Sequence, residues 1–570
     1  MNTSHLKFLL LLCLSLFLSV VSVPVRAQTT GDWRFGVVES YTAPNSAREM
    51  GAAWTRVRFQ WADAQKDGPD SWTTQISDQQ IEQEVAAGRL VVGLLIGIPE
   101  WARDEDGLPQ GLWLPYDDPD NTWGTFVRQI AERYAGRIDH WIIWNEPDIE
   151  SSAVAHTWDG TVDDFAQLQR VAYLAAKEAN PDATIHLAAF TYWADVYAER
   201  KQYMARLLDR FLADPDAAQH GYYFDVATAH LYFQPDQIYD LLLLFQGIMQ
   251  ERDMEKPIWL VETNAPPHDD PAWPVPERTL AVMQDEQAAF MPQAMVSALA
   301  AGAERVAIYK MQDTVGDRRA NPEPFGLLRL DGSRRPAFRA LHVAMQYIGG
   351  SSEVTRERWD EIGQFRLMQQ DRMTTVLFTR LADEQQAVVP AIADRALLVD
   401  LRGTKDWIDA QDGQYLIDLP PALCIQSIGD YCMIGGSTYY LIQALDGGDP
   451  PEGLPSLSPQ PTITPTSPPT LTPTSSPTVE PSPTSTVTGT PLPSSPTPPP
   501  AAVPLSPTVV PPSPTTAGIW TPESSGLVSE EETPDSANQE NSTQDTTVLL
   551  LGVLGFTAIL LGVWWFLVRR

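Results

Sequence analysis

The stretch His140-Trp-Ile-Ile-Trp-Asn-Glu-Pro147 decides the fold of this chain. It opens with a short, largely apolar run that is typical of a strand buried on both faces, and Glu146 stands just beyond the end of that run. A second run of the same kind, Pro257-Ile-Trp-Leu-Val261, is followed directly by Glu262. Strands buried on both faces belong to parallel sheets, whose carboxyl ends meet at one edge, so we expect the two glutamates to face a common site.

Short apolar runs alternate with longer amphipathic stretches up to residue 349. The apolar runs predict eight strands, at 34–38, 55–60, 90–96, 140–144, 184–189, 225–230, 257–261 and 305–309. Helix-like stretches lie between or after them, at 78–87, 122–135, 162–179, 201–213, 237–252, 277–301 and 336–348. This alternation predicts an α/β protein with a (β/α)8 TIM barrel. The alternative is an open doubly wound sheet, but no glycine-rich phosphate loop follows the first predicted strand.

The rest of the chain divides by composition into further parts. Lys7, an apolar run at 8–21 and a small-residue exit at 25–27 predict a secretory signal peptide. After residue 349, short strand-like runs predict a small β-sandwich-like domain, and a tract rich in Pro, Thr and Ser then predicts a disordered stalk. We therefore expect a signal peptide at 1–27, the barrel at 28–349, the β-domain at 350–446, the stalk at 447–546 and a transmembrane anchor at 547–570.

The anchor is predicted from the uncharged segment 548–568, which is followed by Arg569 and Arg570. At about 1.5 Å per residue this segment is long enough to cross a bilayer as one helix. Terminal arginines favour the cytoplasmic side, so we expect a single-pass protein of the cell membrane whose barrel is extracellular. The formal net charge of −34 argues against nucleic acid as a partner, because phosphates repel such a surface.

Of the three cysteines, Cys424 and Cys432 lie beyond the predicted signal peptide. In a secreted chain two cysteines at this spacing either close a small loop as a disulfide or remain as two half-buried thiols. The sequence leaves this choice open, and it shows no spacing of His and Cys residues that is typical of a metal site.

Side chains with binding chemistry fall at or just beyond the other predicted strand ends. They include Arg56 or Arg58 on the second strand, Trp101 after the third, Asn145 after the fourth, Tyr192 and Trp193 after the fifth, His230 and Tyr232 at the sixth, and Tyr309 on the eighth. In a (β/α)8 barrel these positions converge on one pocket. Carboxylates flanked by aromatic rings suit a neutral sugar, whose C–H faces stack on the rings while its hydroxyl groups form hydrogen bonds.

These segments resemble those of the clan A glycoside hydrolases. Thr55-Arg56 is similar to the second-strand arginine of that clan, Ile98-Pro-Glu-Trp-Ala102 to the end of its third strand, and His230-Leu-Tyr232 to its sixth-strand His-x-Tyr motif. The segment Trp144-Asn-Glu-Pro-Asp148 is most similar to family 39, the β-xylosidase and α-iduronidase group. The resemblance extends over about residues 33–349.

The chain departs from the clan at the end of the eighth strand, where a tryptophan often forms the floor of the sugar site. Here the segment Val306-Ala-Ile-Tyr-Lys-Met311 contains no tryptophan. Tyr309 or a loop residue is expected to serve instead, and Lys310 at this place could meet an acidic sugar.

The resemblance implies a retaining glycosidase that acts on an oligosaccharide or polysaccharide without a cofactor or metal. In that mechanism Glu262 is the nucleophile, and Glu146 is first the acid and then the base. The residues expected to hold the sugar or to support the nucleophile are Asn145, Arg56, His230, Tyr232, Trp101 and Tyr309. The alternative is a non-catalytic carbohydrate-binding or adhesion protein on a barrel scaffold, because a stalk and an anchor also suit an adhesin.

Overall fold

The computed structural model describes residues 31–74, 76–149, 156–275, 280–320, 323–451 and 453–457. The predicted signal peptide, nearly all of the predicted stalk and the predicted anchor lie outside these residues. Among the helices in the described ranges, none has the length and apolar character needed to cross a membrane.

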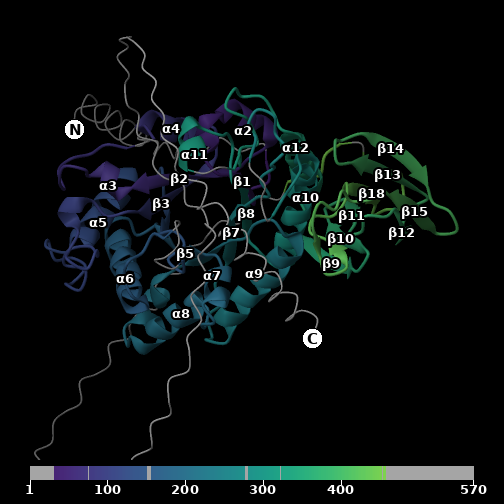
Figure 1. Cartoon of the computed structure of the whole chain (residues 1–570). Helices are drawn as coiled ribbons and strands as arrows, with labels where there is room; N and C mark the ends of the chain where they lie inside the picture. The colour runs from purple at the N-terminus through teal and green to yellow at the C-terminus, as the bar shows by residue number, and fades with distance from the viewer. Residues whose placement is uncertain are drawn as a thin grey trace, which may run out of the picture.

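Eight parallel strands close into a barrel in chain order (Figure 1). They are β1 (Phe35–Val37), β2 (Trp54–Gln60), β3 (Leu90–Ile96), β4 (His140–Ile143), β5 (Thr184–Phe190), β6 (Val226–His230), β7 (Ile258–Thr263) and β8 (Arg305–Ile308). Nearly every residue of these strands is buried, because side chains on one face fill the barrel while those on the other pack under helices. The predicted TIM barrel is confirmed.

Helices surround this barrel. They are α2 (Pro44–Met50), α3 (Trp61–Ala64), α4 (Asp78–Ala86), α5 (Thr122–Tyr134), α6 (Val162–Ala179), α7 (Trp193–Tyr197), α8 (Tyr203–Ala213), α9 (Pro235–Gln250), α10 (Gln284–Ala300), α11 (Val315–Ala320) and α12 (Pro336–Ile348), with short 3-10 turns η1 (Ser40–Thr42), η2 (Glu100–Ala102) and η3 (Ala217–Tyr223). The sequence pattern missed α2, α3, α7 and α11, because helices of two turns or fewer give no amphipathic repeat.

The helix predicted at 277–301 was placed too early. Residues 280–283 are not helical, and α10 begins at Gln284. The Glu286 carboxylate accepts the Met283 N–H at 3.0 Å, which satisfies one of the free donors at the start of this helix.

The amino-terminal end of the barrel is closed by large aromatic side chains from several strands. The Trp54 and Trp259 rings lie 5.4 Å apart between centroids, and Trp259 also stacks on His140 at 5.4 Å. His140 Nδ1 and His186 Nε2 lie 3.0 Å apart, so the imidazoles bond to each other inside the floor. Because this end is filled, polar chemistry is confined to the opposite end of the barrel.

The C-terminal β-domain has two layers. A six-stranded antiparallel sheet has the order β14-β13-β18-β11-β10-β9, and a two-stranded antiparallel sheet, β12-β15, covers one of its faces. The strands are β9 (Glu353–Trp359), β10 (Ile362–Met368), β11 (Arg372–Thr379), β12 (Gln385–Pro390), β13 (Arg395–Asp400), β14 (Lys405–Asp409), β15 (Gln414–Leu419) and β18 (Tyr439–Ala444). The predicted β-domain is thus confirmed. Its edge strand β14 was missed because it is polar and mostly exposed.

Alternate residues of the sheet divide between two cores, as the period of a strand requires. Val376 and Tyr440 pack into the core that contains the barrel helices, whereas Leu377 and Leu441 pack under the two-stranded sheet β12-β15. The side chain of Gln293, buried in α10, bonds to the Gly435 N–H and the Gly436 carbonyl at 3.0 Å each. The β-domain is therefore joined to the barrel beside α10 and α12 (Figure 1).

The structure contains the disulfide Cys424–Cys432. It closes a small hairpin formed by β16 (Ser427–Ile428) and β17 (Tyr431–Cys432). Glu286 of α10 accepts the Ile425 N–H at 3.1 Å, so this hairpin is also held to the barrel. Of the two alternatives left by the sequence, the disulfide is the one observed.

We expect Trp259→Ala to lower the free energy of unfolding by about 3–5 kcal/mol, because it leaves a cavity in the closed barrel floor. Urea unfolding followed by circular dichroism measures this loss. Trp113→Ala is the matched control, since Trp113 is 63% exposed and its loss should cost clearly less, at most about 1–2 kcal/mol. Equal losses in the two variants would contradict the role assigned to the floor.

Candidate active site

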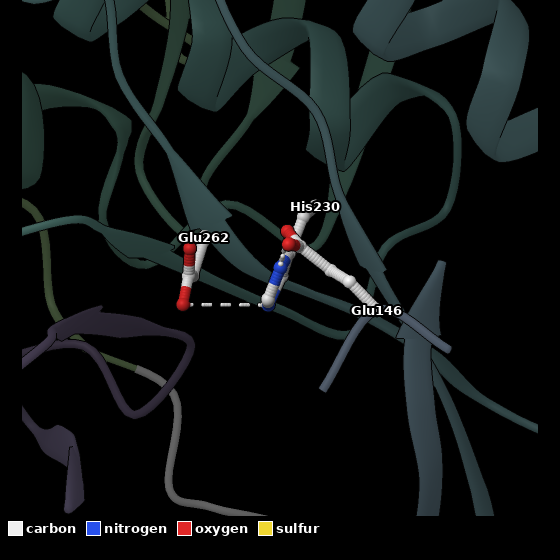
Figure 2. A group of neighbouring side chains, drawn as sticks. All are labelled: Glu146, His230 and Glu262. Atoms are coloured by element: carbon white, nitrogen blue, oxygen red, sulfur yellow. Dashed lines mark hydrogen bonds and ion pairs between the residues drawn. The ribbon is translucent and has the colours of Figure 1, made fainter. Parts of the chain in front are cut away.

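Glu146 and Glu262 share one small volume at the carboxyl end of the barrel. Glu146 lies just beyond β4, Glu262 lies near the end of β7, and they are only 5% and 3% exposed. Three atoms lie within 4.8 Å of one another: one carboxylate oxygen of Glu146, one carboxylate oxygen of Glu262 and one ring nitrogen of His230. Figure 2 shows the His230 side chain between the two carboxylates. The structure therefore brings the two predicted glutamates together.

The chain after β4 adopts a conformation that few residues other than glycine favour. Trp144 and Glu146 have φ values of 71° and 47°, an arrangement that costs about 1–3 kcal/mol per residue. Surrounding bonds hold it in place: Glu146 N–H donates to the Ala189 carbonyl at 3.2 Å, and the Thr157 hydroxyl donates to the Asn145 carbonyl at 2.6 Å. This turn aims the Glu146 side chain into the barrel mouth instead of along the strand.

Glu262 is surrounded by groups that favour its charged form. Arg56 on β2 places Nη1 2.5 Å from Glu262 Oε1, and the Tyr232 hydroxyl donates to Glu262 Oε2. Burial alone would raise the pKa of Glu262, but the charge of Arg56, the nearby His230 and the Tyr232 bond outweigh it and hold the pKa below its usual range. Glu262 is therefore an anion with a fixed orientation.

His230 connects the two carboxylates. Its Nδ1 lies 2.6 Å from Glu146 Oε1, and its Nε2 lies 3.4 Å from Arg56 Nη1 and 3.5 Å from Glu262 Oε1. Because a carboxyl oxygen that carries no proton only accepts, we assign a ring proton to Nδ1, which donates it to Glu146 Oε1. His230 thus occupies Oε1 of Glu146 and leaves the other oxygen for chemistry.

Glu146 has the opposite electrostatic character to Glu262. Burial raises the pKa of Glu146, and the negative charge of Glu262 raises it further, whereas the bond from His230 lowers it. On balance the pKa of Glu146 lies above its usual range. Its Oε2 atom is buried and accepts no hydrogen bond from any residue in the described part of the chain. Because Oε1 is engaged by His230, a proton on Glu146 resides on Oε2, where it is available to a bound molecule.

Aromatic rings line the site on the side of β8. Tyr309 is fully buried and meets Phe325 edge to face, with ring centroids 5.5 Å apart; Phe325 meets Tyr232 in the same way at 5.7 Å. The Asn264 side chain donates to the carbonyls of Tyr309 and Phe325 and fixes both segments. Tyr309 was predicted here. Phe325 was not assigned to the site, although its segment belongs to the resemblance, because its position depends on a loop that returns after β8.

Lys310 does not offer a free charge to a ligand. Its ammonium lies 2.9 Å from Glu39 Oε2 and 2.8 Å from Asp317, and the side chain is only 4% exposed. Glu39 follows β1 and Asp317 belongs to α11, so neither partner could be recognised from the sequence around Lys310. The suggestion that Lys310 meets an acidic sugar therefore finds no support in this arrangement.

Trp101 and Asn145 differ in how the structure places them. Asn145 is buried beside Glu146. Trp101, in the turn η2, meets Trp61 of α3 edge to face at 6.2 Å and donates its indole N–H to the Gln65 carbonyl. The turn after β3 therefore anchors the Trp101 ring against α3, and the structure gives no evidence for the predicted contact of this ring with substrate.

The triad of Glu146, His230 and Glu262 offers donor atoms of the types that bind zinc or other transition metals. The charges around it do not suit a metal ion. Arg56 already occupies Glu262 Oε1, and it also approaches His230 Nε2, so a divalent cation here would lie against a buried guanidinium. These residues do not fit a metal ion.

Asp148 is a third buried carboxyl group close to this turn. Its Oδ2 accepts the backbone N–H and the hydroxyl of Thr191, each at 2.8 Å. Burial raises its pKa to about 7; the Thr191 bonds oppose this rise, and the charges of Glu146 and Asp195 add to it. Asp148 therefore joins the β4 and β5 loops. Its carboxyl group is mostly protonated, and so uncharged, once the pH is well below 7.

Solved structures of glycoside hydrolases have this fold. One is a family 39 glycoside hydrolase from the gut symbiont Bacteroides cellulosilyticus WH2, with 17% identity, coverage of 74% of this chain and 83% of that chain, and a TM-score of 0.55. Another is a glucosidase from Croceicoccus marinus, with 13% identity, coverage of 73% and 97%, and a TM-score of 0.50. No protein-family model and no curated protein matches this chain. The predicted resemblance to clan A glycoside hydrolases is confirmed for the fold, which is what identities this low establish.

We expect Asp148→Asn to change how stability depends on pH. In the folded chain the pKa of Asp148 is about 7, above the value of about 3.9 for an unfolded aspartate. The wild-type chain therefore loses stability as the pH rises from about 3.9 to about 7, and this loss persists at higher pH. Asparagine keeps an acceptor for Thr191 but has no charge to bury. Urea unfolding at pH 4 and pH 8 should therefore show a gain of a few kcal/mol for the variant at pH 8 relative to pH 4; an unchanged pH dependence would refute the buried neutral carboxyl.

Proposed function

We propose that this protein is a retaining glycoside hydrolase with Glu262 as the nucleophile and Glu146 as the acid and base. The observation that carries the proposal is that one carboxylate oxygen of Glu146 lies within 4.8 Å of one carboxylate oxygen of Glu262. Retaining enzymes hold their carboxyl groups about 5–5.5 Å apart, whereas inverting enzymes need roughly 6.5–9.5 Å to admit a water molecule. The fold shared with glycoside hydrolases supports the same class of reaction.

The reaction takes place in two displacements. In the first, Glu262 forms a bond to the anomeric carbon while the bond to the leaving oxygen breaks, and that oxygen takes the proton from Glu146 Oε2. In the second, Glu146 removes a proton from water, the water oxygen bonds to the anomeric carbon, and the ester to Glu262 breaks. Both carboxyl groups return to their starting states, and the product keeps the anomeric configuration of the substrate.

The surrounding residues have separate tasks in this scheme. Arg56 and Tyr232 keep Glu262 charged and aimed at the anomeric carbon, and His230 holds the proton of Glu146 on Oε2. Asn145, beside the acid, is placed to bind the hydroxyl group next to the anomeric carbon. Tyr309 lines the site from the β8 side.

The substrate that suits this site is a neutral sugar. The positive charge of Lys310 is balanced by Glu39 and Asp317, and Arg56 is committed to Glu262. An added sugar carboxylate would have neither cation available, whereas sugar hydroxyl groups would find carboxylate and amide partners.

We also propose that the enzyme works outside the cell, held to the membrane by the segment 548–568. The signal-like amino terminus and the uncharged C-terminal segment of the sequence support this, and the disulfide Cys424–Cys432 suits an oxidising compartment. The non-catalytic adhesin is less well supported, because a scaffold has no need for a buried Arg56–Glu262 pair aimed at a second carboxyl group.

The direct test is the hydrolysis of a panel of aryl glycosides by the full-length chain. We expect Glu262→Gln to reduce kcat at least about 10⁴-fold, since removing the nucleophile of a covalent mechanism is among the most damaging changes. Glu357→Gln, on β9 of the C-terminal domain, should leave activity unchanged. Proton NMR of the first product formed should show retained anomeric configuration; an inverted product would exclude the double displacement.

We expect Glu146→Ala to act according to the leaving group. Substrates with good leaving groups, such as dinitrophenyl glycosides, need no acid for bond cleavage, so their first step should be nearly unaffected, whereas alkyl glycosides should lose about 10²–10⁴-fold in kcat/KM. Azide, which needs no base, should restore turnover of the dinitrophenyl substrate and yield a glycosyl azide. An equal loss on all substrates, without rescue, would remove Glu146 from the role of acid and base.

A further inference from the structure

The short helix α7 presents aromatic rings at the rim of the barrel. Trp193 and Tyr197, one turn apart, have ring centroids 5.8 Å apart and planes within 27° of parallel. Tyr192 meets Trp193 edge to face at 5.1 Å. Tyr197 is 51% exposed and Trp193 is half-buried, so these two rings form a partly open apolar surface, called here the α7 platform.

The opposite side of α7 is fixed by charge. Asp195, two residues after Trp193 and therefore on the other face of the helix, is only 1% exposed. It pairs with Arg200 and, at 2.9 Å, with Arg206, and it accepts the Tyr203 N–H at 2.5 Å. A five-residue helix has little stability of its own, so these buried bonds are what keep the platform in one position.

The same anchors connect the platform to the turn that carries Glu146. Arg200, while paired with Asp195, donates to the Asp148 carbonyl at 2.8 Å. Asp148 in turn accepts two bonds from Thr191 at the end of β5. The Glu146 N–H also donates to the Ala189 carbonyl of β5. The platform and the turn that carries Glu146 are therefore linked by hydrogen bonds through Asp148 and β5.

The direction of the displacement brings the leaving group to this side of the barrel. Glu262 attacks from β7, so the departing oxygen lies on the far side of the anomeric carbon, where Glu146 on β4 protonates it. The β5 loop is the neighbour of β4, and α7 follows β5 directly. A sugar unit attached through the departing oxygen would thus extend over the β4 and β5 loops.

From this geometry we propose, on the basis of the function proposed above, that the α7 platform is a binding site for the leaving-group sugar. Trp193 and Tyr197 would stack on the C–H face of a pyranose unit that follows the cleaved bond. Exposed aromatic surface on a rim is otherwise unfavourable in water, and here the ion pairs of the buried Asp195 hold it at the end of β5, next to the β4 loop that carries Glu146. The enzyme should therefore favour neutral oligosaccharides over glycosides with a simple aglycone.

The test compares xylobiose and xylohexaose, and cellobiose and cellohexaose, with the matching glycosyl fluorides, whose leaving group has no ring to stack on the platform, on the full-length chain. Trp193→Ala and Tyr197→Ala should each lower kcat/KM for the sugar series that is cleaved by about tenfold, through KM, and should leave the glycosyl fluoride within about twofold of wild type. Tyr197→Phe, which keeps the ring, should restore wild-type values. Trp407→Ala, which removes a partly exposed ring far from the barrel mouth, should change neither substrate.

The outcomes separate the two proposals. If the alanine variants cleave oligosaccharides as well as wild type does, the platform is not a sugar site, although the hydrolase proposal stands. If they lose activity on oligosaccharides and glycosyl fluorides alike, α7 does not act through the leaving-group sugar, which also overturns the platform. If the wild-type chain cleaves neither class of substrate, it is the proposed function that fails.

Discussion

The ion pair between Arg56 and Glu262 is the interaction on which the site depends. Both side chains are almost completely buried, and a buried pair of charges is stable only when each has good partners. Glu262 has them in Arg56 and the Tyr232 hydroxyl, so one carboxylate of the site is held as an anion. The other, Glu146, has no cation of its own among the described residues and receives only the ring proton of His230. One fold thus gives two glutamates opposite proton affinities.

The backbone near the carboxyl end of the barrel is strained at several residues. Besides Trp144 and Glu146, Tyr192 after β5 and Phe233 after β6 have positive φ values of 72° and 67°. Strained residues of this kind persist only where the rest of the structure is stable enough to hold them. The opposite end of the barrel supplies that stability through the closely packed Trp54, Trp259 and imidazole floor. Stability and chemistry therefore lie at opposite ends of the same eight strands.

The sequence was informative where a feature is local. The eight strands could be predicted because most of them are short, largely apolar runs, and Glu146 and Glu262 because each stands at or just beyond the end of such a run. Features set by distant partners could not be predicted. Lys310 is neutralised by Glu39, which lies 271 positions away. Trp101 has the expected place in the sequence, but the η2 turn directs its ring to α3.

In the proposed mechanism, the change of Glu146 from acid to base would follow from the same ion pair. While Glu262 is charged, its field raises the pKa of Glu146 and keeps the acid protonated. Once Glu262 becomes an ester that field vanishes, and Arg56 is left without its counter-charge beside His230. The unbalanced guanidinium then favours the anionic form of Glu146, because it already lowers the pKa of that group from across the imidazole. Forming the covalent intermediate therefore both removes the reason for Glu146 to hold a proton and adds a reason to lose it, which is what activation of the incoming water requires.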